Sequence, residues 1–434
     1  MCLTAAAPIS AQTPASAPLT LSFADAVRLA AGEAPAVTVA TLKTGEADAR
    51  VRQARSALLP SLSVAGVWLN RTFNTQSLGI PFPPQFAIQN PVPPFNNYDG
   101  RVSASQTLFD WSSVSRVRAA RTQADGSRAE RSVTVEGSAL TAAEAYLRAA
   151  RARAVVAARQ ADSSVAAELV ALAQAKKAAG VSPAIDLTRA QAQLVTAEGL
   201  LLVARNQLDR ARIDVSRALG LDPAAPLALT DTLDASLAAS DVPADRGAAV
   251  TAALANRPDL RAELARGAAA RQTGSAIRAE RLPRVEVAGD YGLNGTTVPN
   301  AIGTRDLTVQ VSVPILDGFR REARADEQDA VARESQVREA DLRRQIAADV
   351  DAALLDLRSA QAQGLVAAEQ LRLAEDELSQ AREQFRAGVA GNTEVIDAQS
   401  NLIRARDTEI DARYAAVTAR VSLARAVGVA RTLH

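Results

Sequence analysis

The chain has little of what most catalytic and metal sites require. Its 434 residues include one cysteine, Cys2, and one histidine, His434. A single cysteine excludes an intrachain disulfide. A Ser-His-Asp triad, a Cys-His pair and a zinc site of cysteine and histidine ligands are excluded as well, because the body of the chain lacks these side chains. Carboxylate-only chemistry stays open, but we expect a protein that is not an enzyme and has no catalytic residue, metal site or cofactor.

Aromatic residues, net charge and long apolar runs are also scarce. Aromatics make up 3% of the chain, too few for a conventional globular core, so that long helices packed through small side chains are expected instead. The net charge of +1 gives no bulk attraction to nucleic acid, and we expect no nucleic-acid partner. No run of apolar residues reaches the roughly 18 that a transmembrane helix needs.

Residues 1–19 are predicted to be a signal-peptide remnant or a flexible N-terminus. Residues 3–19 carry no charge and pass from small apolar side chains to a Pro/Ser-rich stretch, as at the end of a secretory signal with a cleavage site near Ala11. The first basic residue is Arg28, so the basic start of such a signal is missing and the true start site stays open. Cys2 lacks the leucine context of a bacterial lipid-attachment site, and its lipidation stays open too.

The sequence contains an internal repeat. Residues 178–194, AAGVSPAIDLTRAQAQL, align without a gap with residues 386–402, RAGVAGNTEVIDAQSNL. Upstream, LPSLSVAG matches LPRVEVAG in the same order. We therefore divide the chain into a first repeat at 20–225, a linker at 226–243 and a second repeat at 244–430. Each repeat is expected to run helix, strand, strand, long helix, helix, and the Pro-, Asp- and Ser-rich linker is typical of a boundary.

Two segments in each repeat alternate apolar with polar residues, which predicts strands with one apolar face. The predicted apolar positions of the second repeat are Val285, Val287, Tyr291, Leu293, Leu307, Val309, Val311, Val313 and Ile315. Those of the first repeat are Leu62, Val64 and Trp68 on one strand, and Val102, Ala104 and Leu108 on its partner. Four aromatic residues lie near the ends of these segments: Trp68, Trp111, Tyr291 and Phe319. They fit the rings of aromatic side chains found at membrane–water interfaces, although ordinary local packing would also explain them.

The remaining segments have the pattern of coiled coils. From Leu187 to Val215 a large apolar residue recurs every seven positions, and alanines from Ala190 to Ala218 follow three positions later. This is an a/d seam. The second repeat has alanine at the same heptad position and a neighbouring stripe of isoleucines. Two adjacent apolar stripes on a helix mean that it can contact two neighbouring helices. Residues 112–177 are nearly free of Gly and Pro and would span about 100 Å as one helix.

These patterns create a closure problem for a single chain. Four amphipathic strands do not close a barrel, and an open sheet edge cannot face lipid. Long helices with two apolar stripes cannot bury both within one chain. Symmetric association solves both problems, and three copies would supply 12 strands, enough for an aqueous lumen.

The repeat and its motifs resemble the TolC-like outer-membrane efflux protein family. The motifs are the LP junctions before the strands, PILDG at 314–318, NRPDL at 256–260 and the two G-V turns, and the resemblance covers residues 20–430. It implies a homotrimer in the Gram-negative outer membrane, with a 12-stranded β-barrel continued by a long α-helical coiled-coil barrel through the periplasm. It also implies a passive exit duct of a tripartite efflux or type I secretion system, whose partners are a periplasmic adaptor (membrane fusion) protein, an inner-membrane pump and outer-membrane lipid.

One segment departs from the family pattern. The loop between the first two strands, at about 70–100, is longer than its counterpart in the second repeat and contains a Pro-rich stretch at 79–95. We interpret it as a variable external loop, with a lid or receptor role as the alternative. Whether Phe82, Phe86 and Phe95 pack over a barrel mouth stays open.

The resemblance also assigns roles to individual residues. It places the turns containing Gly180 and Val181, and Gly388 and Val389, at the periplasmic tips that meet the adaptor. It places an acidic constriction, the gate, at the start of the last helix, where the carboxylates are Glu394 and Asp397. Asp186, the equivalent of Glu394 in the first repeat, is the third predicted gate residue. The residues alone leave an alternative, because glycines also cap helix ends and acids stabilise helix N-termini.

Two other protein classes are compatible with parts of the sequence. Heptads and Ala-rich helices alone would also suit a structural or membrane-surface coiled-coil protein, but the alternating segments at matching places in both repeats argue against it. A periplasmic adaptor would have one helical hairpin rather than a tandem repeat. The cargo, whether drug, metal ion or protein, the cognate pump and adaptor, and the open or closed state are not encoded visibly.

Overall fold

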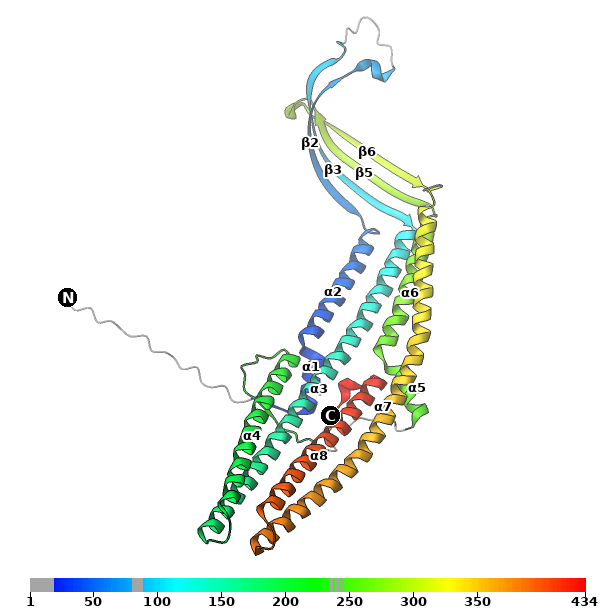
Figure 1. Cartoon of the computed structure of the whole chain (residues 1–434). Helices are drawn as coiled ribbons and strands as arrows, with labels where there is room; N and C mark the ends of the chain where they lie inside the picture. Colours follow the sequence, from blue (N-terminus) through cyan, green and yellow to red (C-terminus); the bar gives the residue numbers. More distant parts are fainter. Residues whose placement is uncertain (1–18, 80–88, 235–236, 239–241, 244) are drawn as a thin grey trace, which may run out of the picture. The chain divides into compact units, whose positions relative to one another are not determined.

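The computed structural model describes residues 19–79, 89–234, 237–238, 242–243 and 245–434. Figure 1 shows long helices and one curved sheet. The chain forms two compact units. The helical unit consists of Met1–Leu42, Ala129–Arg261 and Ala340–His434, and the sheet unit of Lys43–Arg128 and Ala262–Glu339. Each unit therefore takes segments from both halves of the sequence.

The order of elements is the same in both halves, and corresponding helices have equal lengths. The first half contains α1 Phe23–Glu33 (11 residues), α2 Pro35–Ser56 (22), β2 Ser61–Phe73, β3 Val92–Asp110, α3 Trp111–Ala178 (68) and α4 Ala184–Leu219 (36). The second half contains α5 Arg246–Asn256 (11 residues), α6 Pro258–Ala279 (22), β5 Arg284–Gly295, β6 Ile302–Ser312, α7 Arg320–Ala387 (68) and α8 Asn392–Val427 (36). The long helix expected at 112–177 is confirmed as α3, whereas the bounds of the linker stay a prediction.

The first helix of each half is broken in two, where the sequence predicts one. The breaks precede Pro35 and Pro258, which are the first residues of α2 and α6. Proline has no backbone N–H and a fixed φ, so it suits the first turn of a helix but interrupts a helix interior. The same residue type at matching places therefore produces the same break.

The sheet unit is built on one antiparallel sheet with the strand order β2-β3-β5-β6. Figure 1 shows the four strands side by side, with β2 and β6 at the edges. Strands β2 and β3 reach further into the predicted 70–100 loop than expected, because β2 runs to Phe73 and β3 begins at Val92. Phe95 belongs to β3, opposite Arg71, whereas Phe82 and Phe86 lie outside the described residues.

The two faces of the sheet differ in chemistry. In the register, Leu62 pairs with Ala104 and Val64 with Val102, so the predicted faces of β2 and β3 coincide. Leu108 falls at an irregularity in the β3–β5 register, between Thr107 and Phe109, and it is exposed. The apolar face is exposed to the outside of the single chain; its large side chains are Leu62, Val64, Trp68, Val102, Tyr291, Leu293, Leu307, Val309 and Val311.

No described helix is both long and apolar enough to cross a membrane. The exposed apolar side chains of the sheet are a separate feature. Fully burying a large apolar side chain is worth about 1.5–3 kcal/mol. A largely apolar face left open in the single chain therefore marks a surface that lipid or another protein covers.

The main core of the helical unit surrounds Tyr146 of α3. Its ring packs edge-on against Phe23 at 5.7 Å, and its hydroxyl lies 3.0 Å from the carbonyl oxygen of Leu21 and 3.1 Å from Asp231 Oδ2, so its single proton is available to either acceptor. Burial raises the pKa of Tyr146 to about 12, so the hydroxyl keeps its proton at neutral pH. This core also holds β1 (Leu19–Leu21), which pairs in parallel with β4 (Leu227–Leu229). The sequence did not predict this short pair.

The predicted seam of α4 is confirmed. Its buried residues include Ala190, Ala197, Leu201, Ala204, Leu208 and Val215. In α8, Ala398, Ala412, Ala419 and Ala426 are buried, together with Ile410 and Val417 from the neighbouring stripe. Alanine at the seam lets helix backbones approach closely, which explains how few aromatic residues the chain needs.

The end of α4 provides a test of backbone fit. Gly220 has φ +71°, and a Cβ there would lie 2.6 Å from Pro35 Cδ. Gly220→Ala should lower the melting temperature of the purified protein, because the left-handed backbone alone costs about 1–2 kcal/mol for a non-glycine residue. Gly199 lies in the same helix with nothing within 4 Å of a Cβ, so Gly199→Ala is the matched control and should raise stability by about 0.5–1 kcal/mol. Equal melting temperatures for the two variants would contradict this account.

Candidate functional site

The helical hairpins α3–α4 and α7–α8 end in matching turns. Gly180 and Gly388 have φ values of +73° and +77°. The N–H of Val181 donates to the carbonyl of Lys176 at 3.0 Å, and the N–H of Val389 donates to the carbonyl of Gln384 at 3.0 Å. Together with the Gly180 and Gly388 N–H bonds, this is the Schellman arrangement, which favours glycine at the left-handed position. Both glycines therefore cap helix ends, and they occupy a left-handed position that favours glycine.

The residue after each glycine is exposed. The side chain of Val181 is 71% exposed and that of Val389 is 82% exposed. A Schellman turn often packs this position against the preceding helix, whereas both valines here are largely exposed. Each of the two equivalent tips therefore presents one apolar side chain to solvent.

The acidic residues at the tips fall into two classes. Glu394 and Asp397 lie exposed in the first two turns of α8, and neither forms a hydrogen bond or ion pair with another described residue. Asp186 is 9% exposed and accepts a hydrogen bond from Ser182 Oγ at 2.6 Å. The nearby Arg189 contacts Thr393 instead. The structure therefore brings the three predicted carboxylates to one end of the helical unit but leaves only two of them free.

Direct bonds join the two hairpins near their tips. Lys176 Nζ donates to the backbone carbonyl of Phe385 and lies 4.2 Å from the centre of its ring. Asn392, 1% exposed, donates from Nδ2 to the carbonyl of Asp186 at 3.0 Å. These contacts hold the hairpins together in this structure. Sequence reasoning missed both, since the partners lie more than 200 positions apart and no local pattern marks them.

Charged side chains tie α3 to α8 farther from the tips. Asp162 is 2% exposed and pairs with Arg159 at 3.0 Å and Arg406 at 2.7 Å. Arg159 also reaches Asp407 at 2.5 Å. Breaking such a buried pair typically costs about 3–5 kcal/mol. This cluster makes the contact between the hairpins more resistant to separation here than at the exposed tips.

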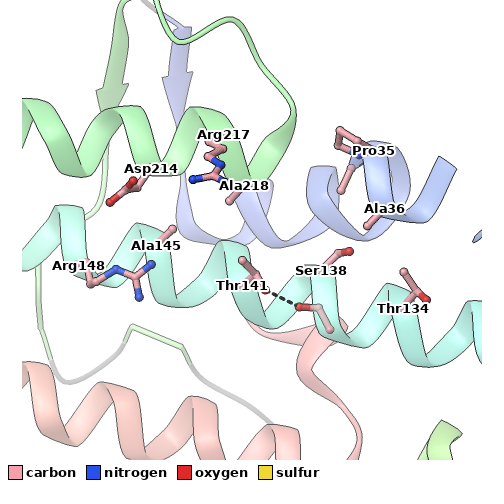
Figure 2. A pocket seen from close by; sticks show the side chains of 12 residues that line it. Pro35, Ala36, Thr134, Ser138, Thr141, Ala145, Arg148, Asp214, Arg217 and Ala218 are labelled. Atoms are coloured by element: carbon pink, nitrogen blue, oxygen red, sulfur yellow. Dashed lines mark hydrogen bonds between the residues drawn. The ribbon is translucent and has the colours of Figure 1, made fainter. Parts of the chain in front are cut away.

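A groove of about 730 Å³ also opens in the helical unit, beside α3 (Figure 2). Small or short polar side chains form much of its lining, among them Thr134, Ser138, Thr141 and Ala145, and Arg148, Asp214 and Arg217 lie toward one end. Thr141 Oγ1 donates back to the carbonyl of Gly137 at 2.9 Å, as Thr often does within a helix. Such a surface suits close approach by another segment of protein. Within the described part of the chain, no three His, Cys, Asp or Glu side chains gather as metal ligands would.

The chain matches the model of the outer membrane efflux protein family over residues 26–221 and 249–429. The chain belongs to this family. The match covers both halves and every long helix and strand, so the function follows from the whole architecture rather than from one motif. The protein is an outer-membrane efflux channel protein, and members of its family are channel proteins.

Individual relatives agree with this assignment. The chain is 26% identical to Protein CyaE of Bordetella pertussis over 397 residues, covering 90% of this chain and 80% of that protein. It is 25% identical to the pyoverdine export outer membrane protein OpmQ of Pseudomonas putida, covering 76% and 70% of the two chains. The fold is that of the outer membrane protein VceC of Vibrio cholerae, with a TM-score of 0.75, 17% identity and coverage of 94% and 96%.

The bond between Lys176 and Phe385 can be tested in this channel protein. Lys176→Met removes a charged hydrogen bond and a cation–π contact, together worth roughly 2 kcal/mol. The hairpins should separate more readily, and single-channel conductance in planar bilayers should rise. Lys177 is exposed on the same helix turn, so Lys177→Met is the control and should leave conductance unchanged. If both variants conduct like the unmodified protein, the bond does not hold the tips together.

Proposed function

We propose that three copies of the chain form the passive exit duct of a tripartite efflux or type I secretion system. The observation that carries the proposal is the sheet with two open edges and one exposed apolar face. Four strands per chain give 12 strands in a trimer, and joining β6 of one copy to β2 of the next leaves no unpaired edge. The apolar face then contacts outer-membrane lipid and the polar face lines a water-filled lumen.

The helical unit supports the same assembly. Figure 1 draws α3 and α8 between α4 and α7, and the Arg159–Asp407 pair joins α3 to α8. Both flanking helices keep apolar side chains exposed. On α4 these are Val195, Leu202, Val203 and Ile213, and on α7 they are Leu355, Leu365, Val366 and Leu373. Contact between α4 of one copy and α7 of the next would bury both stripes and close a tube of helices.

Each sequence repeat has a matching part in this proposal. The repeats at 20–225 and 244–430 each supply two strands and one long hairpin, and the linker at 226–243 joins them. Residues 1–18 and most of the Pro-rich stretch lie outside the described residues, so the signal-peptide remnant, the lipidation of Cys2 and the external-loop role stay predictions.

The partners follow from the two ends of such a duct. The exposed Val181 and Val389, presented by the turns at Gly180 and Gly388, are the proposed contacts for a periplasmic adaptor. The adaptor would connect the duct to an inner-membrane pump that supplies the energy for transport. The relatives support export as the activity, since OpmQ is named for pyoverdine export.

The exposed acids are the proposed gate. In a three-fold assembly, Glu394 and Asp397 would each occur three times around the axis, and crowded carboxylates attract cations. Asp186 is proposed as the fixed counterpart in the first hairpin, because its carboxylate is already held by Ser182. The hairpin with free acids would then move while the other stays in place.

Assembly is tested by mass and conductance together. The protein extracted from the outer membrane should have the mass of three chains in detergent and form discrete channels in planar bilayers. Closure of the sheet edges requires this, because a single chain leaves both edges open. A monomer that keeps its strand signal in circular dichroism, or a protein released by carbonate washing, would favour the coiled-coil alternative and refute the duct.

The gate is tested by replacing both free acids. Glu394→Ala with Asp397→Ala should abolish block by multivalent cations added from the periplasmic side, because six carboxylates leave the axis of a trimer. The control is Glu369→Ala with Asp376→Ala, which removes the same formal charge from α7, where both acids pair with Arg372. The control should keep the block. If multivalent cations still block the gate variant, these acids only stabilise the helix N-terminus.

A further inference from the structure

The polar face of the sheet holds an arginine near its middle. Arg101 of β3 lies opposite Ala65 of β2 and Gly292 of β5. The other two arginines of this face lie toward its ends: Arg71 lies 5.8 Å from the ring centre of Phe95, and Arg284 pairs with Glu286. Arg101 therefore lies in the regular part of the register, between the irregularities at Arg71/Phe73 and Thr107/Phe109.

The Arg101 side chain lies along the sheet instead of projecting from it. Its Nε and Nη2 donate to Asp99 on the same strand, at 3.2 and 3.0 Å. Its Nη1 bonds to Asp290 Oδ1 of β5 at 2.5 Å, and its Nη2 reaches Thr304 of β6 at 3.4 Å. A further carboxylate, Asp306 of β6, lies 3.9 Å away. One guanidinium thus contacts three adjacent strands.

Gly292 makes this conformation possible. A Cβ at this position would lie 3.0 Å from Arg101 Cγ, 3.1 Å from Arg101 Cα and 2.7 Å from the carbonyl oxygen of Gly100. Any larger residue would occupy the space over which the arginine passes and would force its charged end away from the sheet. The glycine and the arginine therefore form one arrangement, which keeps a long basic side chain against the wall.

The charges around Arg101 do not cancel. The carboxylates of Asp99, Asp290 and Asp306 and one guanidinium leave a net charge of −2 per chain. Asp306 is 76% exposed at its side chain, whereas Arg101, Asp99 and Asp290 are each about one-quarter exposed. The negative charge is thus presented outward by Asp306, and the positive charge is held close to the backbone.

We propose that Arg101, held flat over Gly292, is a specificity-determining residue of the barrel lumen. It offsets part of the acidic charge on the wall and so sets how strongly the barrel prefers cationic over anionic solutes. The inference rests on the proposed trimeric duct, in which this polar face lines the lumen and the arrangement occurs three times. It is independent of the acids at the hairpin tips, because Glu394 and Asp397 belong to the helical unit.

A purely structural role is the competing explanation. In that case Arg101 only fastens β3 to β5 and β6, and its loss would change stability without changing ion preference. The two explanations separate in the reversal potential across a planar bilayer with a KCl gradient. The measurement is best made at or below 0.1 M salt on the dilute side, where charges act over about 10 Å or more.

Arg101→Gln should raise the cation-to-anion permeability ratio by about twofold or more, because the wall loses its counter-charge. Arg101→Lys keeps the charge and should stay close to the unmodified ratio even if the fork of hydrogen bonds is lost. Asp306→Asn has the opposite effect on charge, because it removes a negative charge from the same wall. Its carboxylate is the most exposed of the three and the farthest from Arg101, so the strands should stay paired while the ratio falls.

The outcomes distinguish the inference from the function on which it rests. If the unmodified protein forms no channels, the proposed duct fails. If it forms channels and all three variants show its permeability ratio, the duct stands and the role of Arg101 is wrong. If Arg101→Gln fails to assemble, Asp306→Asn decides alone: a lower ratio supports the inference and an unchanged ratio overturns it.

Discussion

The rest of the structure depends on the unpaired hydrogen-bonding edges of one sheet. In the single chain, β2 and β6 each pair on one side only. Inside a membrane an unpaired N–H or carbonyl group finds no water, and each such group costs several kcal/mol. In the proposed trimer, pairing of these edges between copies removes that cost. Once these edges are paired between copies, the apolar face would contact lipid and the polar face would line a lumen. The exposed apolar stripes of α4 and α7 would then be buried between neighbouring copies.

The internal repeat supplies the strands and helices that the proposed pairing between copies requires. Each half of the chain contributes two strands and one hairpin, and corresponding helices have identical lengths of 11, 22, 68 and 36 residues. The two copies differ in how the carboxylates near their hairpin tips are held. Asp186 is buried and bonded to Ser182, whereas its counterpart Glu394 is exposed and free. In the proposed gate, this difference in charge environment is what lets one hairpin stay fixed while the other moves.

Most of the fold could be predicted from the sequence, because the fold uses long periodic segments. The seven-residue spacing of Leu187 to Val215 predicted the seam of α4, and period-two alternation predicted the strands. Short or long-range features could not be predicted in this way. The β1–β4 pair has only three residues per strand, and the contact of Lys176 with Phe385 joins residues 209 positions apart. For the candidate site, the sequence predicted the turn glycines and the acids, but the burial of Asn392 and the flat course of Arg101 over Gly292 depend on contacts that no local pattern records.

Disulfide trapping between sheet edges tests the closure most directly. In a Cys2→Ser background, one cysteine replaces Ser63 of β2 and a second is moved along the same face of β6 through Thr304, Asp306, Thr308 and Gln310. These positions lie on opposite edge strands of one chain, separated by β3 and β5, so a bond between them must join two copies. The account predicts that one or two of the β6 positions give a covalent product that stops at three chains, because a closed ring has no free edge left. Products that extend beyond three chains, or no covalent product at any β6 position in the outer membrane, would contradict it.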